Sequence, residues 1–223
     1  TNHGILIVDG SAAKAFTVVG SDGKDSITGG SGGDVITGGT GVDTIDGGAG
    51  NDTFNYAAQA DLFSGTAIVD SIVGGDGVDT IQIGSASDAF TIADTLNWSN
   101  ASGVETIKSV TDSAAVKVTL GASAAVAGIT KVDLSLAGSA TVGANIINVS
   151  AYTSSTDTTL IGSTTGKTNI TGGDGKDKII AAAGGGTIDA GHGLDLITLG
   201  AGVDTVKMTQ TLDAVSYTHL TLP

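Results

Sequence analysis

Apolar residues recur at every ninth position through residues 20–55, separated by glycine-rich polar stretches. The segment divides without insertion into four rows of nine residues, GSDGKDSIT, GGSGGDVIT, GGTGVDTID and GGAGNDTFN. Each row has glycine at position 4, aspartate at position 6 and an apolar residue at position 8. Glycine turns tightly at low steric cost, and the last three residues suit a strand whose central side chain faces inward. The pattern therefore predicts a turn and a three-residue strand in every row.

Two rows make one coil, so rows two apart stack on the same side of the coil, with strands roughly 4.8 Å apart. This stacking places Asp25 over Asp43 and Asp34 over Asp52. Carboxylates at that separation repel each other unless a cation lies between them. A flexible cage of aspartate and main-chain carbonyl oxygens suits Ca²⁺, whereas Mg²⁺ demands a tighter octahedron. We therefore expect structural calcium sites between stacked rows.

A second block of rows covers residues 172–207, as GGDGKDKII, AAAGGGTID, AGHGLDLIT and LGAGVDTVK. Asp177 and Asp195 lie two rows apart and form a complete pair. Gly186 occupies the aspartate position opposite Asp204. The second block is therefore predicted to hold one complete site and one site that binds weakly or not at all.

A single further row, GGDGVDTIQ at residues 74–82, carries Asp79. Its partner by spacing is Asp61, which lies in a segment without the glycine turns. Main-chain carbonyls of the glycine turns are expected to complete each site. The predicted metal-binding residues are Asp25, Asp34, Asp43, Asp52, Asp79, Asp177, Asp195, Asp204, Gly23, Gly32, Gly41, Gly50, Gly175 and Gly193.

Residues 104–171 contain short segments rich in Val, Ile and Thr, separated by turns of small residues, which predicts further strands. The segments are VETIKSV, VKVTL, ITKVDLSL, NIINVS, TTLIG and KTNIT. Ile161, Ile170 and Ile179 keep the nine-residue spacing, so we expect one parallel solenoid that continues into the second block. Residues 85–103 are the least regular part, and Trp98 is expected to cap the solenoid end.

The composition excludes several classes of function. The 223 residues carry a net charge of −14, and 22 of the 23 acidic residues are aspartate. The nine basic residues are all lysine, so we expect no nucleic-acid binding. No apolar run is long enough to span a membrane, and the absence of cysteine excludes disulfides and thiolate zinc sites. A G-x-S-x-G string at residues 29–33 lies inside the turn repeat, so we expect no catalysis.

The rows match the calcium-binding repeat G-G-x-G-x-D-x-U-x, and over residues 20–55 the chain resembles the RTX, or hemolysin-type, family. The resemblance implies an all-β fold, a right-handed parallel β-roll or β-solenoid with calcium-binding nonapeptide turns. It also implies a bacterial protein exported by a type I route to the cell surface or the medium. Calcium would close the roll only outside the cell.

The string GVETI at residues 103–107 resembles segments of bacterial surface-layer and adhesin RTX proteins. A structural role of that kind is therefore expected. The alternative is the non-catalytic C-terminal module of a secreted enzyme, such as a protease or lipase, or of a toxin. Calcium ions are the expected partners, with self-association or binding to a cell-surface polysaccharide as further candidates.

The domain organisation follows from these blocks. The tail ends in SYTHLTLP, which shares no composition with the rest, and is expected to be disordered or artefactual. The expected parts are a lead-in and cap at 1–19, a first RTX β-roll at 20–84, an irregular segment followed by solenoid strands at 85–171, a second RTX β-roll at 172–207, and the tail at 208–223.

The register can be tested with two aspartates of one row. Asp43→Asn removes a predicted ligand and should cost about 1–2 kcal/mol, which is the contribution of one calcium site. Asp46→Asn changes the net charge equally but lies at the strand end, and should stay within about 0.5 kcal/mol. The calcium midpoint for folding of each variant measures the difference. Equal midpoints would reject position 6 as the ligand position.

Overall fold

The computed structural model describes residues 7–9, 14–85, 89–110, 115–138, 144–153 and 155–207, with only the backbone described for 7–9. The tail expected at 208–223 lies outside the described residues. The chain forms two compact units, and each is described by itself. Unit 1 comprises Thr1–Ile83, Leu96–Lys108 and Val126–Ile129, and unit 2 comprises Gly84–Thr95, Ser109–Ala125 and Thr130–Pro223.

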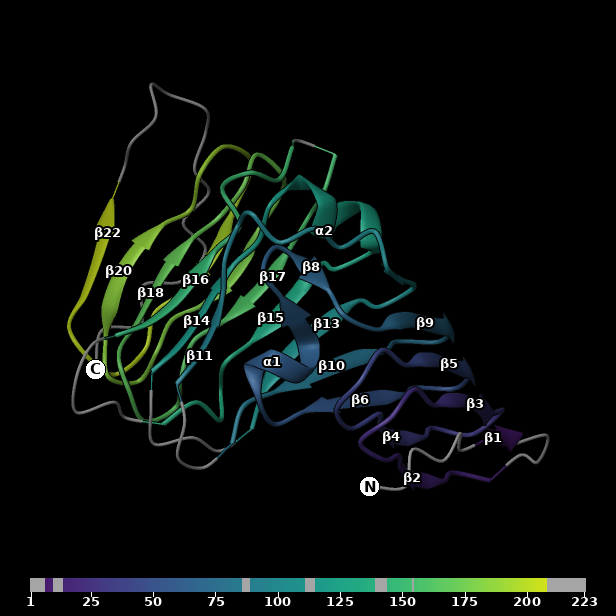
Figure 1. The fold of residues 1–223 in the computed structure, drawn as a ribbon. Helices are drawn as coiled ribbons and strands as arrows, with labels where there is room; N and C mark the ends of the chain where they lie inside the picture. The colour runs from purple at the N-terminus through teal and green to yellow at the C-terminus, as the bar shows by residue number, and fades with distance from the viewer. Residues whose placement is uncertain are drawn as a thin grey trace. The chain divides into compact units, whose positions relative to one another are not determined.

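The strands of unit 1 form two parallel sheets, and the chain alternates between the two sheets until the insertion described below (Figure 1). Every second strand therefore returns to the same sheet, which closes one coil. The first sheet has the order β1 (Ile7–Asp9), β3 (Ser26–Gly30), β5 (Thr44–Ala49), β9 (Ser71–Asp76) and β12 (Ala101–Ser102). The second has the order β2 (Thr17–Val19), β4 (Val35–Thr37), β6 (Thr53–Tyr56), β10 (Thr80–Ile83) and β13 (Thr106–Ser109).

The apolar residue at position 8 of each row faces the core of unit 1, as the sequence predicts. Ile27 pairs with Ile45 across β3 and β5, and Ile36 pairs with Phe54 across β4 and β6. All four side chains are buried. Because burial of one such side chain contributes roughly 1.5–3 kcal/mol, this column of apolar residues is the main non-polar support of the coils.

An insertion lengthens the third coil of unit 1 without changing the columns. Ile45 pairs next with Ile72, and Phe54 with Ile81, so the added residues lie between β6 and β9. They form α1 (Gln59–Leu62) and an antiparallel hairpin of β7 (Phe63–Ser64) and β8 (Ala67–Ile68). Asn97 bridges to the hairpin at Ala67, and the adjacent Trp98 is buried.

Unit 2 has the same architecture, with fewer acidic turns. Each of the segments expected to be strands within residues 104–171 contains one strand, β13 to β18, which confirms that part of the prediction. A short helix, α2 (Ala122–Ala127), follows β14. One parallel sheet has the order β11 (Phe90–Ile92), β14 (Val116–Thr119), β16 (Asn145–Asn148), β18 (Thr168–Thr171), β20 (Gly186–Asp189) and β22 (Asp204–Lys207). The other is β15 (Lys131–Asp133), β17 (Thr159–Ile161), β19 (Lys178–Ile180) and β21 (Leu196–Thr198).

The nine-residue spacing fails at one position of unit 2. Ile161 was expected in the inward column with Ile179, but the register pairs Leu160 with Ile179 and Ile161 with Ile180. Leu160 is fully buried, whereas Ile161 is only half-buried. An extra residue between β17 and β19 shifts the phase, because alternate residues of a strand point to opposite faces.

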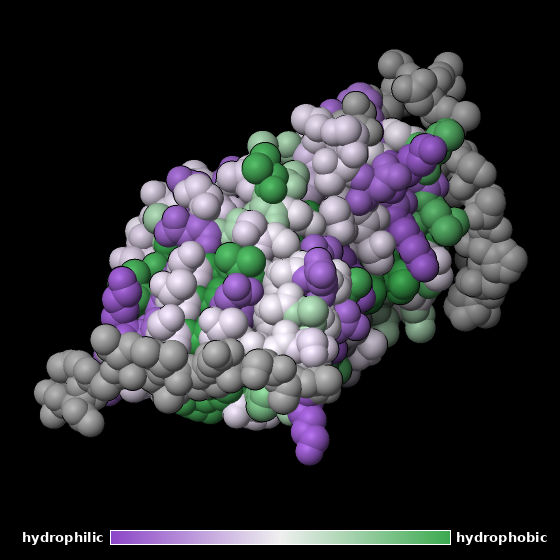
Figure 2. Space-filling model, turned by 90° about the vertical axis from the view of Figure 1, so that its right-hand side faces the viewer, coloured by the Kyte–Doolittle hydropathy of each residue, from purple (hydrophilic) through white to green (hydrophobic). Residues whose placement is uncertain are grey.

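Several exposed aliphatic side chains lie at the tips of the turns. Val42, Val78, Leu194 and Val203 each precede a repeat aspartate, and each is more than half exposed. On the face drawn in Figure 2, hydrophobic side chains lie among polar ones at separate places. Within the described part of the chain, no helix has the length and apolar character needed to cross a bilayer.

The register correction gives a matched pair of variants. Leu160→Ala should cost about 2–5 kcal/mol of unfolding free energy, because it empties a fully buried position. Ile161→Ala, one residue away, should cost well under half of that, because its side chain is partly solvated. Chemical denaturation at saturating calcium measures both. A larger loss for Ile161→Ala would contradict the observed register.

Candidate calcium sites

The turns of successive coils approach each other through their main chains. Gly41 has a φ of +141°, and a Cβ at this position would collide with the carbonyl of Gly23 in the coil before it. No L-residue with a side chain fits there without strain. The glycines predicted to contribute carbonyl oxygens are stacked in this way as the pairs Gly23–Gly41, Gly32–Gly50 and Gly175–Gly193.

The repeat aspartates stack directly on one another, as the spacing predicts. The main-chain N–H of Asp25 donates to Oδ1 of Asp43 at 2.8 Å, and that of Asp34 donates to Oδ1 of Asp52 at 2.7 Å. In unit 2 the N–H of Asp177 donates to Oδ1 of Asp195 at 2.9 Å. All six residues are buried. Their stacking is confirmed, and their role as metal ligands remains a prediction.

The second carboxylate oxygen distinguishes two forms of the turn. In one form, a main-chain N–H of the same turn donates to Oδ2, as Gly30 does to Asp34 and Gly173 to Asp177, both at 2.8 Å. In the other form, no donor among the described residues reaches Oδ2 of the buried Asp43, Asp52 or Asp79. A buried carboxylate oxygen without a partner is costly, so a cation at these positions would remove a large penalty.

Asp79 has a different partner from the one predicted. Its Oδ1 accepts the N–H of Asp52 at 2.7 Å, so Asp79 extends the column of Asp34 and Asp52. Asp61, the partner expected from spacing, lies instead in α1. The prediction was wrong because it assumed a coil of two rows, whereas the insertion gives this coil 27 residues.

Asp70 belongs to the stack and was missed in the sequence. Its Oδ1 accepts the N–H of Asp43 at 2.8 Å, and its Oδ2 accepts the hydroxyl of Tyr56, also at 2.8 Å. The string Asp70-Ser71-Ile72 does repeat positions 6 to 8 of a row and lies one row before Asp79. The signal was hidden because Ile68 stands at position 4 of that row, where the other rows have glycine. The Tyr56 hydroxyl takes the place of a turn N–H.

In the second block, Gly186 pairs with Asp204 across β20 and β22, so it lies opposite Asp204 as the spacing predicts. Asp204 therefore faces no second carboxylate, although its Oδ1 is buried without a partner among the described residues. On the other column, the N–H and hydroxyl of Thr158 both donate to Oδ1 of Asp177, at 3.0 and 2.7 Å. A neutral residue thus occupies the aspartate position above the pair Asp177 and Asp195.

Burial raises the pKa of several of the stacked carboxyl groups. It brings the pKa of Asp52 to about 6 against the opposing N–H of Asp34, and the charges of Asp79 and Asp34 add to the rise. Asp195 likewise has its pKa raised to about 6, mainly by burial. The pKa values of Asp43 and Asp79 are raised for the same reason. Each shift reflects the cost of a desolvated negative charge.

The donor set fits a calcium ion held by few carboxylates. Among the described residues, no three histidine, aspartate or glutamate side chains converge on one point. Each pair therefore offers two carboxylates, and main-chain carbonyls of the glycine turns must complete the shell. Hard oxygen donors of this kind select Ca²⁺ over softer metals. The pairs that would hold an ion are Asp25–Asp43, Asp34–Asp52 and Asp177–Asp195, to which the structure adds Asp43–Asp70 and Asp52–Asp79.

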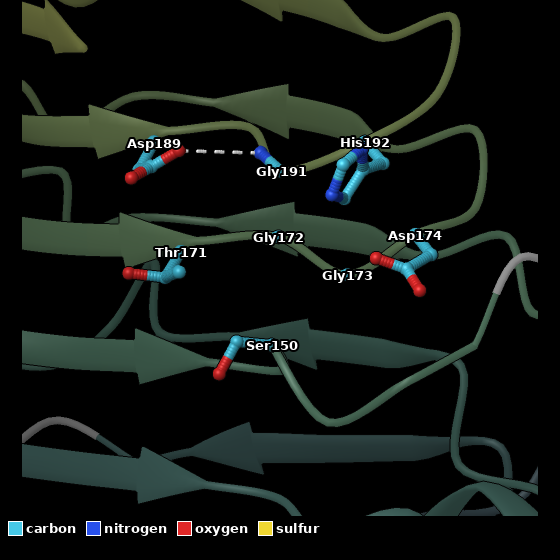
Figure 3. Close-up of a pocket in the computed structure, with 8 residues that line it drawn as sticks. All are labelled: Ser150, Thr171, Gly172, Gly173, Asp174, Asp189, Gly191 and His192. Carbon is cyan, nitrogen blue, oxygen red and sulfur yellow. Dashed lines mark hydrogen bonds between the residues drawn. The ribbon is translucent and has the colours of Figure 1, made fainter. Parts of the chain in front are cut away.

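A polar surface pocket of about 270 Å³ lies on unit 2, over the turns that follow β16, β18 and β20 (Figure 3). Asp174, Asp189 and His192 line it, together with main-chain atoms of the glycine turns. The Oδ1 of Asp189 accepts the N–H of Gly191 at 3.4 Å, which is an interaction within its own turn. His192 is exposed, as expected for position 3 of a row. The pocket is therefore an ordinary groove between turns.

The family model of the RTX calcium-binding nonapeptide repeat matches the chain in four copies, over residues 19–54, 58–88, 166–188 and 171–206. The chain thus belongs to the RTX calcium-binding repeat proteins, and its repeats bind Ca²⁺. Such repeats are non-catalytic structural modules, so this chain contains a calcium-binding structural region of an RTX-type protein. Comparisons with curated proteins and with solved structures gave no match.

The raised pKa values predict opposite effects of pH on the metal-free and the calcium-bound protein. Protonation favours the metal-free fold, whose stability falls as the pH rises from about 4 through the folded pKa of about 6. Calcium needs the carboxylates ionised, so protons compete with it below about pH 6. We expect more β-structure in chelator at about pH 5 than at about pH 7.5, and a higher calcium midpoint at the lower pH. Circular dichroism titrations test both, and a midpoint independent of pH would contradict the prediction.

Proposed function

We propose that the chain is the calcium-binding structural region of a secreted bacterial protein, which folds when it meets calcium outside the cell. The observation that supports this most strongly is the buried Oδ2 atoms of Asp43, Asp52 and Asp79, which lack donors among the described residues. Without a cation, each coil with stacked aspartates must bury one carboxylate next to another. With calcium, the same geometry becomes a coordination shell.

The energy of calcium binding is large enough to drive folding. Extracellular calcium modules have dissociation constants of roughly 10⁻⁴–10⁻³ M. At about 1 mM calcium and a dissociation constant of about 0.1 mM, each site adds about 1.4 kcal/mol. Three sites then add about 4 kcal/mol, which is close to the whole stability of a small domain. The calcium concentration alone would therefore move the chain between an unfolded, exportable state and a folded one.

A surface-layer or adhesin-like role is favoured over that of an enzyme module. RTX repeat proteins are typically secreted, which supports an extracellular or cell-surface location. Among the described residues of β14 to β18, no aspartate accepts the main-chain N–H of another aspartate, so these strands add coils without adding paired carboxylates. A long repetitive scaffold suits a surface structure, with self-association or a cell-surface polysaccharide as its further contacts. A compact roll would be enough for the tail of a secreted enzyme or toxin.

The experiment is a far-ultraviolet circular dichroism titration of the whole chain. In chelator at neutral pH the acidic coils should be largely unfolded, and calcium at about 1–10 mM should restore their β-structure. Magnesium at the same concentration is the control and should fail, because it requires a smaller octahedral shell. A β-spectrum that is the same in chelator and in calcium would refute the proposal.

A further inference from the structure

Glu105 occupies the end of the aspartate column of unit 1. Within unit 1, Asp34, Asp52 and Asp79 follow one another, and each donates its main-chain N–H to the next carboxylate. The N–H of Asp79 continues the series and donates to Oε2 of Glu105 at 2.7 Å. The spacing is 26 residues, and the longer glutamate side chain reaches the position that an aspartate takes elsewhere.

The local sequence around Glu105 is that of a row with glutamate in place of aspartate. Gly103, Glu105 and Ile107 have the spacing of positions 4, 6 and 8, and Gly103 has a φ of +61°. Ile107 is fully buried in β13, as a position 8 residue should be. The repeat matched in this part of the chain ends at residue 88, so the family comparison assigns no repeat to Glu105.

The side chain of Asp79 is buried beside the turn that precedes Glu105. Asp79 is 0% exposed, and no donor within the described residues reaches its Oδ2. A Cβ placed on Gly74 would meet both this oxygen and the carbonyl of Gly103. The free oxygen of Asp79 and the Gly103 carbonyl therefore lie on the same side of Gly74, at the turn that Glu105 follows.

We propose that Asp79 and Glu105 hold a further calcium ion, with the Gly103 carbonyl as a third oxygen donor. This inference rests on the proposed calcium-dependent fold and extends it to a mixed aspartate–glutamate site beyond the matched repeats. Glu105 accepts the main-chain N–H of Asp79, and Oδ2 of Asp79 is desolvated, so two negative groups belong to one turn. A cation would compensate them, and oxygen donors alone favour a hard divalent ion. The competing interpretation is that Glu105 only accepts the last N–H and ends the column.

The test counts the calcium ions bound to the whole chain. Glu105→Gln keeps the size of the side chain and its acceptor oxygen but removes a carboxylate. Asp76→Asn makes the same change of charge at an exposed residue in the row of Asp79 and serves as the control. Equilibrium dialysis at saturating calcium should find one ion fewer in Glu105→Gln than in the wild type, and no loss in Asp76→Asn. Equal counts in all three proteins would overturn the proposal.

A second measurement is independent of whether Glu105→Gln folds. Glu105 is the only glutamate of the chain, so selective ¹³C labelling of glutamate gives a single side-chain carboxyl signal. In the folded protein, exchange of calcium for lanthanum should shift this signal if the carboxylate touches the ion. An unchanged signal would leave Glu105 as a hydrogen-bonding cap only and would overturn the proposal. Failure of the calcium-dependent fold itself would look different, because the wild type would then bind no calcium.

Discussion

The structure depends on the burial of one carboxylate above another in every acidic coil. The position 6 aspartate is held in place by its inward-facing neighbour at position 8, and it contacts the turn glycines at its other side. It cannot move to solvent without breaking the strand pairing that buries the apolar column. The charge is therefore fixed in a poorly solvated place, and neutralising it would stabilise the coil. Burial of the apolar side chain at position 8 and burial of the carboxylate at position 6 therefore occur together.

Much of this arrangement could be predicted because the period of the sequence equals the geometric period. Where two rows make a coil, spacing alone placed Asp25 over Asp43 and Ile27 beside Ile45. Spacing failed where the coil length changed. The insertion gave Asp79 a new partner and concealed Asp70, whose row lacks the glycine at position 4. One extra residue moved the core position from Ile161 to Leu160. These shifts depend on tertiary packing, which leaves no periodic signal.

Neutral residues take the position of the aspartates where the repeat is eroded. In unit 2, Oδ1 of Asn145 accepts the N–H of Val116 at 2.9 Å, much as an aspartate would. Oγ1 of Thr168 accepts the N–H of Ser163 at 3.0 Å within its own turn. These groups reproduce the hydrogen bonds of the acidic coils without adding charge. If folding depends on calcium as proposed, the dependence is a property of individual coils, and coils with amide or hydroxyl side chains at these positions need no ion.

The hydrogen bonds between stacked aspartates all run in one direction. Asp25 donates to Asp43, and Asp34 donates to Asp52, so each coil presents its main-chain donor to the coil that follows it in the chain. The column therefore has a direction, with main-chain donors facing one end and carboxylate acceptors facing the other. Any break in it exposes two unlike faces, one of N–H groups and one of carboxylates. Such faces rejoin only in a single orientation, so the order of the coils is encoded in the direction of their hydrogen bonds.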